Sequence, residues 1–130
     1  MRILWAVFLV NVGLMALVSQ FGRPETGEVE GVPPLLYALG VAGISSVAAS
    51  FFLKASYYRR AAERQQPALL QSGFIVALAL CEAAVLLGLI GLFTTGCDYA
   101  YGLFALGALG MVLHFPRREQ VLASYYKSAM

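Results

Sequence analysis

Residues 68–93 form an apolar run of 26 residues in which Glu82 is the only charged side chain. As an α-helix with a rise of about 1.5 Å per residue, the run would be about 39 Å long, enough to cross a hydrocarbon core of about 30 Å with some tilt. Glu82 would then lie within about 2 Å of the bilayer midplane. An ionisable group at that depth costs on the order of 3 kcal/mol on insertion scales, so it requires a partner, a proton or a function.

The rest of the chain has the same apolar character. Hydrophobic residues make up 60% of the sequence and charged residues only 12%, whereas charge runs near 25% in soluble domains. The first run lacks a good small-x-small cleavage site, so we expect a retained membrane helix and not a signal peptide. We therefore predict an all-α integral membrane protein, a single domain over 1–130 that forms a bundle of four transmembrane helices. The predicted helices are 3–21, 35–53, 68–93 and 99–115.

Basic residues set the predicted orientation. They gather in the connection 54–67 and in the tail after the fourth run, as Lys54, Arg59, Arg60, Arg64, Arg117 and Arg118. By the positive-inside rule this connection and both termini are cytoplasmic, in a bacterial cytoplasmic (inner) membrane. Because these cations belong at helix ends, in the interface, the net charge of +2 does not indicate binding to nucleic acid.

Three further polar residues are predicted at the depth of Glu82: Asn11, Ser45 and Ser46. Buried polar groups in lipid satisfy one another, and interhelical hydrogen bonds contribute about 0.6 to 2 kcal/mol each. Three interpretations stay open. These residues form a structural polar knot that fixes helix register, they form a proton or cation site, or Glu82 faces a partner subunit.

Small residues indicate which helix faces pack together. On the third helix they fall in one stripe, and on the second helix they are nearly continuous; the packing candidates are Ala77, Cys81, Ala84, Gly88 and Gly91 on the third, and Gly43 and Ser50 on the second. Small-xxx-small stripes permit close approach of two helix backbones. We predict that these faces pack on each other, which turns Glu82 away from their seam and towards another helix or another protein.

No cofactor, metal site or catalytic site is predicted. Cys81, Cys97 and His114 lack a metal-ligand spacing, and a rise over 16 residues puts the two thiols about 24 Å apart, beyond disulfide reach. We expect Cys81 to be a small apolar packing residue and Cys97 to be a thiol in a loop. His114 is placed level with Leu70, about 18 Å from Glu82, as an interfacial histidine; a lone haem or pigment ligand is the alternative. No catalytic constellation or phosphate loop is present, so we do not expect an enzyme.

The stretch RQQPALLQSGFIVALALCEAAVLLGLIG (64–91) resembles the proteolipid (c) subunits of rotary ATP synthases. In those hairpins a polar loop with an Arg-Gln-Pro motif precedes a helix with a mid-membrane carboxylate. The matching residues here are Arg64, Gln65 and Pro67 in the loop, Glu82 with Ala83, and Gly88 with Leu89. The chain differs in its extra Gln66, in having alanine and serine where those hairpins repeat glycine, and in its two flanking helices. The resemblance implies that Glu82 carries a proton or cation.

Three functions are weighed. The first is a proteolipid-like membrane subunit that binds a proton or cation at Glu82. The second is a non-catalytic accessory or scaffold subunit of a larger complex, in which Glu82 is a structural hydrogen-bonding group. The third is a small exporter, although proteins similar to the small multidrug family carry their glutamate in the first helix, where this chain has Asn11. The expected partners are the lipid bilayer and further membrane subunits, either copies of this chain or other proteins.

Overall fold

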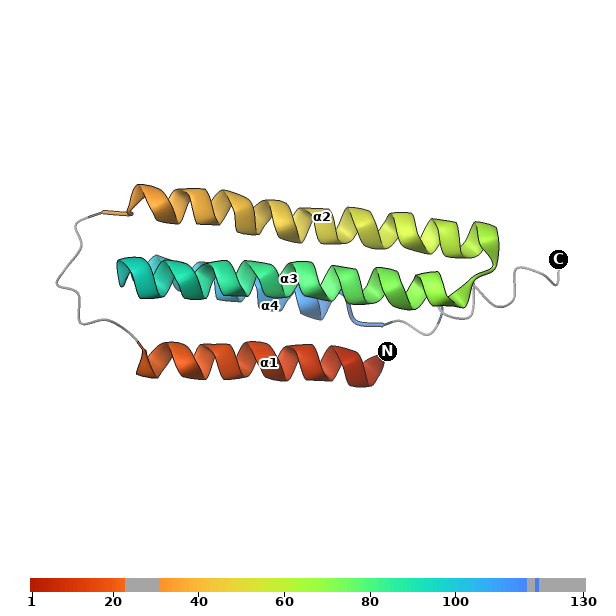
Figure 1. Cartoon of the computed structure of the whole chain (residues 1–130), viewed down its shortest axis with the longest axis horizontal. Coiled ribbons are helices and arrows are strands. Elements are labelled where there is room, and N and C mark those ends of the chain that lie inside the picture. Colours follow the sequence, from red (N-terminus) through yellow and green to blue (C-terminus); the bar gives the residue numbers. More distant parts are fainter. Residues whose placement is uncertain (23–30, 117–118, 120–130) are drawn as a thin grey trace.

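The computed structural model describes residues 1–22, 31–116 and 119, and its regular structure there is entirely helical. The elements are α1 (Arg2–Phe21), α2 (Pro34–Arg64), α3 (Pro67–Thr95), a short 3-10 turn η1 (Asp98–Ala100) and α4 (Tyr101–Leu113). Figure 1 shows the helices lying side by side along one axis, with α3 between α1 and α2. Proline occupies the first turn of both α2 and α3, where its missing N–H has no intrahelical partner to lose. The predicted all-helical class is confirmed.

Three helices in the described part of the chain, α1, α2 and α3, are each long and apolar enough to cross a membrane. The fourth predicted span is shorter. Together η1 and α4 cover Asp98–Leu113, about 24 Å of helix at 1.5 Å per residue. Pro116 follows closely and cannot donate to a continued helix.

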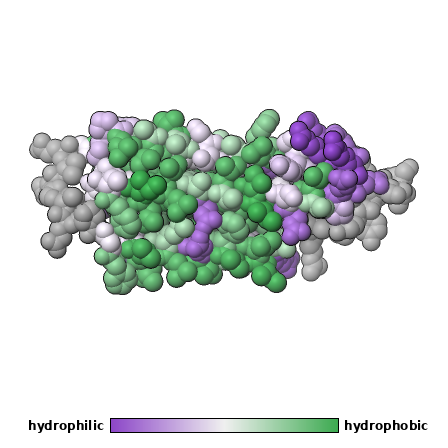
Figure 2. Space-filling view, in the orientation of Figure 1, coloured by the Kyte–Doolittle hydropathy of each residue, from purple (hydrophilic) through white to green (hydrophobic). Residues whose placement is uncertain are grey.

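α2 extends beyond its predicted end. The sequence places the end near Leu53, but the helix continues to Arg64 and stops where Gln65 adopts a left-handed backbone, with φ of 50°. Residues 54–64 contain no glycine or proline, and most are good helix formers. The basic connection is therefore a helical extension and not a loop. This end of the α2–α3 hairpin carries the hydrophilic cluster beside the apolar body in Figure 2.

α3 is the central helix. Its largest interface is with α2, its next largest with α4, and α1 packs on α3 and α4. The core cluster is made of buried side chains from α1, α3 and α4, including Val12, Phe74, Leu78 and Phe104. Small residues are needed at this interface, because a Cβ added to Gly91 would lie 2.9 Å from the Leu36 side chain of α2, and one added to Gly43 would lie 2.6 Å from the Leu103 side chain of α4.

The small stripe of α3 is shared between two neighbours. Ala77, Cys81 and Ala84 are completely buried, as the predicted seam requires. Gly88, however, faces the start of α4, where an added Cβ would lie 3.0 Å from the Ala100 carbonyl oxygen and 2.9 Å from Leu103. The stripe therefore permits close approach of both α2 and α4.

Candidate functional site

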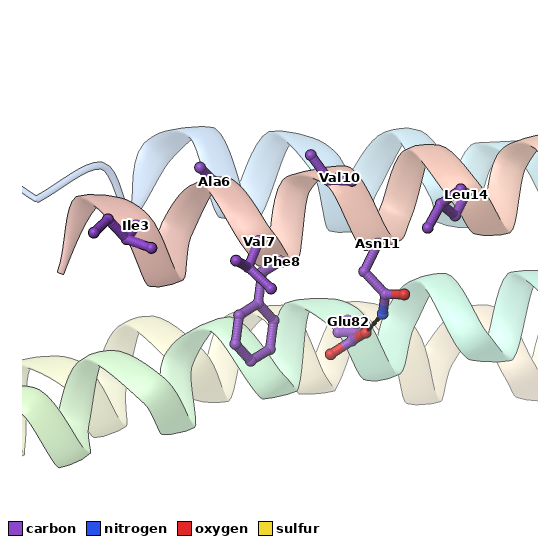
Figure 3. A pocket seen from close by; sticks show the side chains of 8 residues that line it. All are labelled: Ile3, Ala6, Val7, Phe8, Val10, Asn11, Leu14 and Glu82. Atoms are coloured by element: carbon purple, nitrogen blue, oxygen red, sulfur yellow. Dashed lines mark hydrogen bonds between the residues drawn. The ribbon is translucent and has the colours of Figure 1, made fainter.

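Glu82 lies on the face of α3 that meets α1, away from the α2 seam. Its Oε1 accepts a hydrogen bond from the Nδ2 of Asn11 on α1, drawn as the dashed line in Figure 3. The two residues are 71 positions apart in sequence, and the structure joins them as their shared depth predicts. The pair links the most peripheral helix of the bundle to its central one.

The polar groups of this pair are only half satisfied. Within the described residues, Asn11 is the only hydrogen-bond partner of Glu82, and no bond reaches Oε2 or the amide oxygen Oδ1 of Asn11. Neither oxygen is buried, because every buried side-chain nitrogen or oxygen there has a partner. Two acceptor oxygens at this pair are therefore open to whatever lies beside the helices.

A groove of about 530 Å³ lies beside the pair. Glu82 and Asn11 are its polar residues, and the rest of its lining comes from apolar side chains of α1, namely Ile3, Ala6, Val7, Phe8, Val10 and Leu14. In the close view of Figure 3 these side chains follow α1, with the Asn11–Glu82 pair between α1 and α3. The site is thus a carboxyl and an amide oxygen in an apolar groove on the outside of the bundle.

Ser45 and Ser46 do not join this site. The Ser46 hydroxyl donates to the Ala42 carbonyl of its own helix at 2.9 Å, and Ser45 is exposed on α2. Both serines lie on α2, whereas Asn11 lies on α1, on the other side of α3 (Figure 1). The predicted cluster of four polar residues is therefore corrected to the pair Asn11 and Glu82. Equal depth fixes only the position along the bundle axis and does not say towards which neighbouring helix a side chain points.

A second polar cluster lies inside the bundle, and the sequence analysis missed it. Ser50 on α2 has its Oγ 2.8 Å from the Nε2 of His114 and 3.6 Å from the Sγ of Cys81. The ammonium of Lys54 donates to the His114 carbonyl oxygen at 3.4 Å. All four residues are buried, with His114 only 1% exposed and Lys54 8%. The side chains of His114 and Lys54 therefore lie inside the bundle and not on its surface.

The hydrogen bonds assign the proton positions in this second cluster. The Ser50 hydroxyl donates to the Val47 carbonyl at 2.6 Å, so its one proton is already used. In the tautomer that carries its proton on Nε2, the His114 imidazole then donates to the serine oxygen. Ser50 and His114 therefore form a structural pin between α2 and the end of α4.

The other predicted residues are distributed as follows. Arg59, Arg60 and Arg64 lie exposed on the end of α2, and Arg59 pairs with Glu63 at 3.9 Å. Arg117 and Arg118 lie outside the described residues. Cys81 and Cys97 are free thiols, and Cys97 lies in the short loop between α3 and η1, where it is only 9% exposed. Among the residues that the structure describes, no group of three or more His, Cys, Asp or Glu could hold a metal ion.

The sequence analysis also missed the polar contacts that attach α1. The indole Nε1 of Trp5 donates to the Met111 carbonyl at 2.8 Å, and the Gln20 amide donates to the Tyr101 hydroxyl at 3.0 Å. The spacing of residues in the sequence indicated which face of α1 packs against the bundle. The inward face of α1 follows a heptad-like spacing of three and four residues through Met1, Trp5, Phe8, Val12, Met15 and Ser19.

Comparison with known proteins assigns no relationship. No family model matches the chain, and neither a curated protein nor a solved structure matches it. The functional argument therefore depends on the site itself.

Proposed function

We propose that this chain is a small polytopic membrane subunit that binds a proton reversibly at Glu82, in the manner of a proteolipid subunit. The half-satisfied carboxyl carries the proposal. Oε1 is held by Asn11, which fixes the side chain, while Oε2 is open to the groove and can take and release a proton. A charged carboxylate beside lipid is costly, which makes a proton the ligand that this site can take up most favourably.

A proton fits this site better than a metal cation. Hard cations are held in proteins by six or more oxygen ligands, some of them waters. Only the oxygens of Glu82 and Asn11 meet here, since Ser45 and Ser46 lie elsewhere on α2. The resemblance of 64–91 to the proteolipid subunits supports the same assignment.

We propose four membrane crossings with both termini in the cytoplasm of a bacterial cell. α1, α2 and α3 cross completely, and η1 with α4 makes the short fourth crossing. α2 is about 46 Å long at 1.5 Å per residue, so its basic end extends past a core of about 30 Å. The partners are the lipid bilayer and a membrane subunit, a second copy or another protein, that lies against Glu82.

The orientation is tested with single cysteines in a Cys97→Ala background. Tyr99 is 70% exposed in η1, and Gln66 is exposed between α2 and α3. Tyr99→Cys should react with an impermeant maleimide in intact cells, and Gln66→Cys should react only after the membrane is opened. The reverse pattern would overturn the orientation.

The proton site is tested with a hydrophobic carbodiimide, which enters lipid and modifies protonated carboxyls. Labelling at neutral pH should map to Glu82, while Glu63, exposed on the end of α2, should stay unmodified and serves as an internal control. In proteoliposomes that contain the assembled complex, Glu82→Gln should assemble normally and abolish proton-coupled activity, whereas Glu82→Asp should retain part of it. Proton flux that survives Glu82→Gln would refute the proposal.

A structural role is the second candidate, and one observation favours it. α1 is largely exposed, and it is attached to α3 and α4 by individual polar contacts that include the Asn11–Glu82 bond. If that attachment is the purpose of Glu82, glutamine should replace it with little loss of assembly or activity, because the glutamine carbonyl also accepts from Asn11.

A further inference from the structure

The groove beside Glu82 combines apolar walls with a floor that accepts hydrogen bonds. Glu82 and Asn11 line it, neither Oε2 of Glu82 nor Oδ1 of Asn11 is buried, and both oxygens are acceptors when the carboxyl is ionised. The remaining lining consists of apolar side chains of α1, and the volume of about 530 Å³ lies within the usual range for small-molecule sites. A lipid acyl chain would pack against the apolar walls but would offer no hydrogen-bond donor to the two oxygens.

We propose that this groove binds a lipophilic amine, meaning an apolar body that carries one primary or secondary amino group. The ammonium form donates to the Glu82 carboxylate and to the Asn11 amide oxygen, and such charge-assisted bonds are about twice as strong as neutral ones. The apolar body lies along Val7, Val10 and Leu14. The site rests on the proposed function, since the carboxyl of Glu82 supplies the proton.

The proton balance is complete without a further reactant. A neutral amine enters the groove from the bilayer and takes the proton from the Glu82 carboxyl. The carboxyl O–H bond breaks, an N–H bond forms on the amine nitrogen, and the product is an ammonium–carboxylate pair. The net charge within the membrane is zero before and after the transfer, so the step avoids placing a single uncompensated charge in lipid.

The test uses dansylcadaverine, a primary amine whose dansyl group accepts energy from tryptophan. Trp5 is the only tryptophan of the chain, and it lies on α1, the helix that lines the groove. The wild-type protein in liposomes should show saturable energy transfer from Trp5. The N-acetylated compound, which cannot form an ammonium, should bind at least about tenfold more weakly, because a hydrogen bond to a charged group contributes about 1.5 to 3 kcal/mol.

Two protein variants localise the binding. Glu82→Gln should lose binding about tenfold, because the amide neither supplies a proton nor carries a charge. Ala6→Phe fills the groove and leaves Glu82 in place, so it should also weaken binding. Its matched control is Ala48→Phe, at another exposed alanine, on α2 and outside the groove, which should bind dansylcadaverine like the wild type.

Carbodiimide labelling separates failure of this inference from failure of the proposed function. Protection of Glu82 by dansylcadaverine, but not by the acetylated compound, would support the amine site. Normal labelling of Glu82 with equal binding of both compounds would overturn the amine site, make the groove an ordinary lipid-facing surface and leave the proton site intact. A Glu82 that does not react at neutral pH would count against the proposed function, and the amine site would fall with it.

Discussion

Gly107→Ala should loosen the attachment of α4 to α3. A Cβ built on Gly107 would lie 2.6 Å from the Cys81 carbonyl oxygen, a backbone atom that no rotamer change can move. α4 must then shift outwards, and overpacking of this kind costs about 1 to 3 kcal/mol. The matched control is Gly102→Ala in the same helix, where nothing lies within 4 Å of an added Cβ. Replacing glycine inside a helix gains about 0.5 to 1 kcal/mol, which opposes part of the cost at Gly107. Gly102 is the second residue of α4 and serves as the control for the added methyl group.

The measured quantity is the difference in unfolding free energy between these two variants in mixed detergent micelles. We expect Gly107→Ala to be less stable than Gly102→Ala by about 1 to 3 kcal/mol. Trp5 fluorescence gives a second reading, because its indole donates to the Met111 carbonyl of α4 and should lose that bond when α4 moves. Equal stability within about 0.5 kcal/mol, with unchanged Trp5 emission, would refute the packing argument.

The remaining predictions concern the two polar clusters. Ser50→Ala removes the acceptor of a buried His114 Nε2–H and should lower the free energy of unfolding by about 1 to 3 kcal/mol. The double variant Ser50→Ala, His114→Phe should be no less stable than Ser50→Ala alone, because replacing both partners by apolar groups can be nearly neutral. Additive losses of the two substitutions in the same unfolding assay would contradict the structural pin. Asn11→Leu should destabilise the wild type by about 0.6 to 1.7 kcal/mol more than it destabilises a Glu82→Leu background, and a coupling energy of zero would mean that the bond does not contribute to stability.

Much of the architecture follows from length, apolarity and small-residue faces. An apolar run has few alternatives in lipid to a helix of its own length, so α1 and α3 end within about two residues of their predicted limits. The angular argument on α3 also succeeded, since Glu82 points away from the α2 seam and meets α1. The predicted end of α2 was wrong, because the apolar run stops at Leu53 while residues with good helix propensity continue to Arg64.

The interior cluster could not be predicted because it depends on how far α4 is displaced along α3. Aligning helix midpoints placed His114 level with Leu70. In the structure Gly110 packs on Cys81, with an added Cβ only 2.8 Å from its Sγ, so in antiparallel helices His114 lies level with about residue 77. Seven residues of rise are about 10 Å, enough to bring His114 from the interface to Ser50. The glycines of α4 permit this shift. The apolar pattern alone does not determine how α4 is aligned along α3.

The proposed proton site and the structural bond at Glu82 can coexist. Asn11 donates and Glu82 accepts at Oε1, so the bond needs only an oxygen lone pair there. A proton on Oε2 leaves that lone pair in place, and so does the loss of that proton. α1 can therefore stay docked while the carboxyl changes its protonation state, and exchange does not require the helix to move. A histidine or lysine in place of Asn11 would add its own charge to the site and couple docking to titration, whereas an amide, which does not titrate, keeps the two independent.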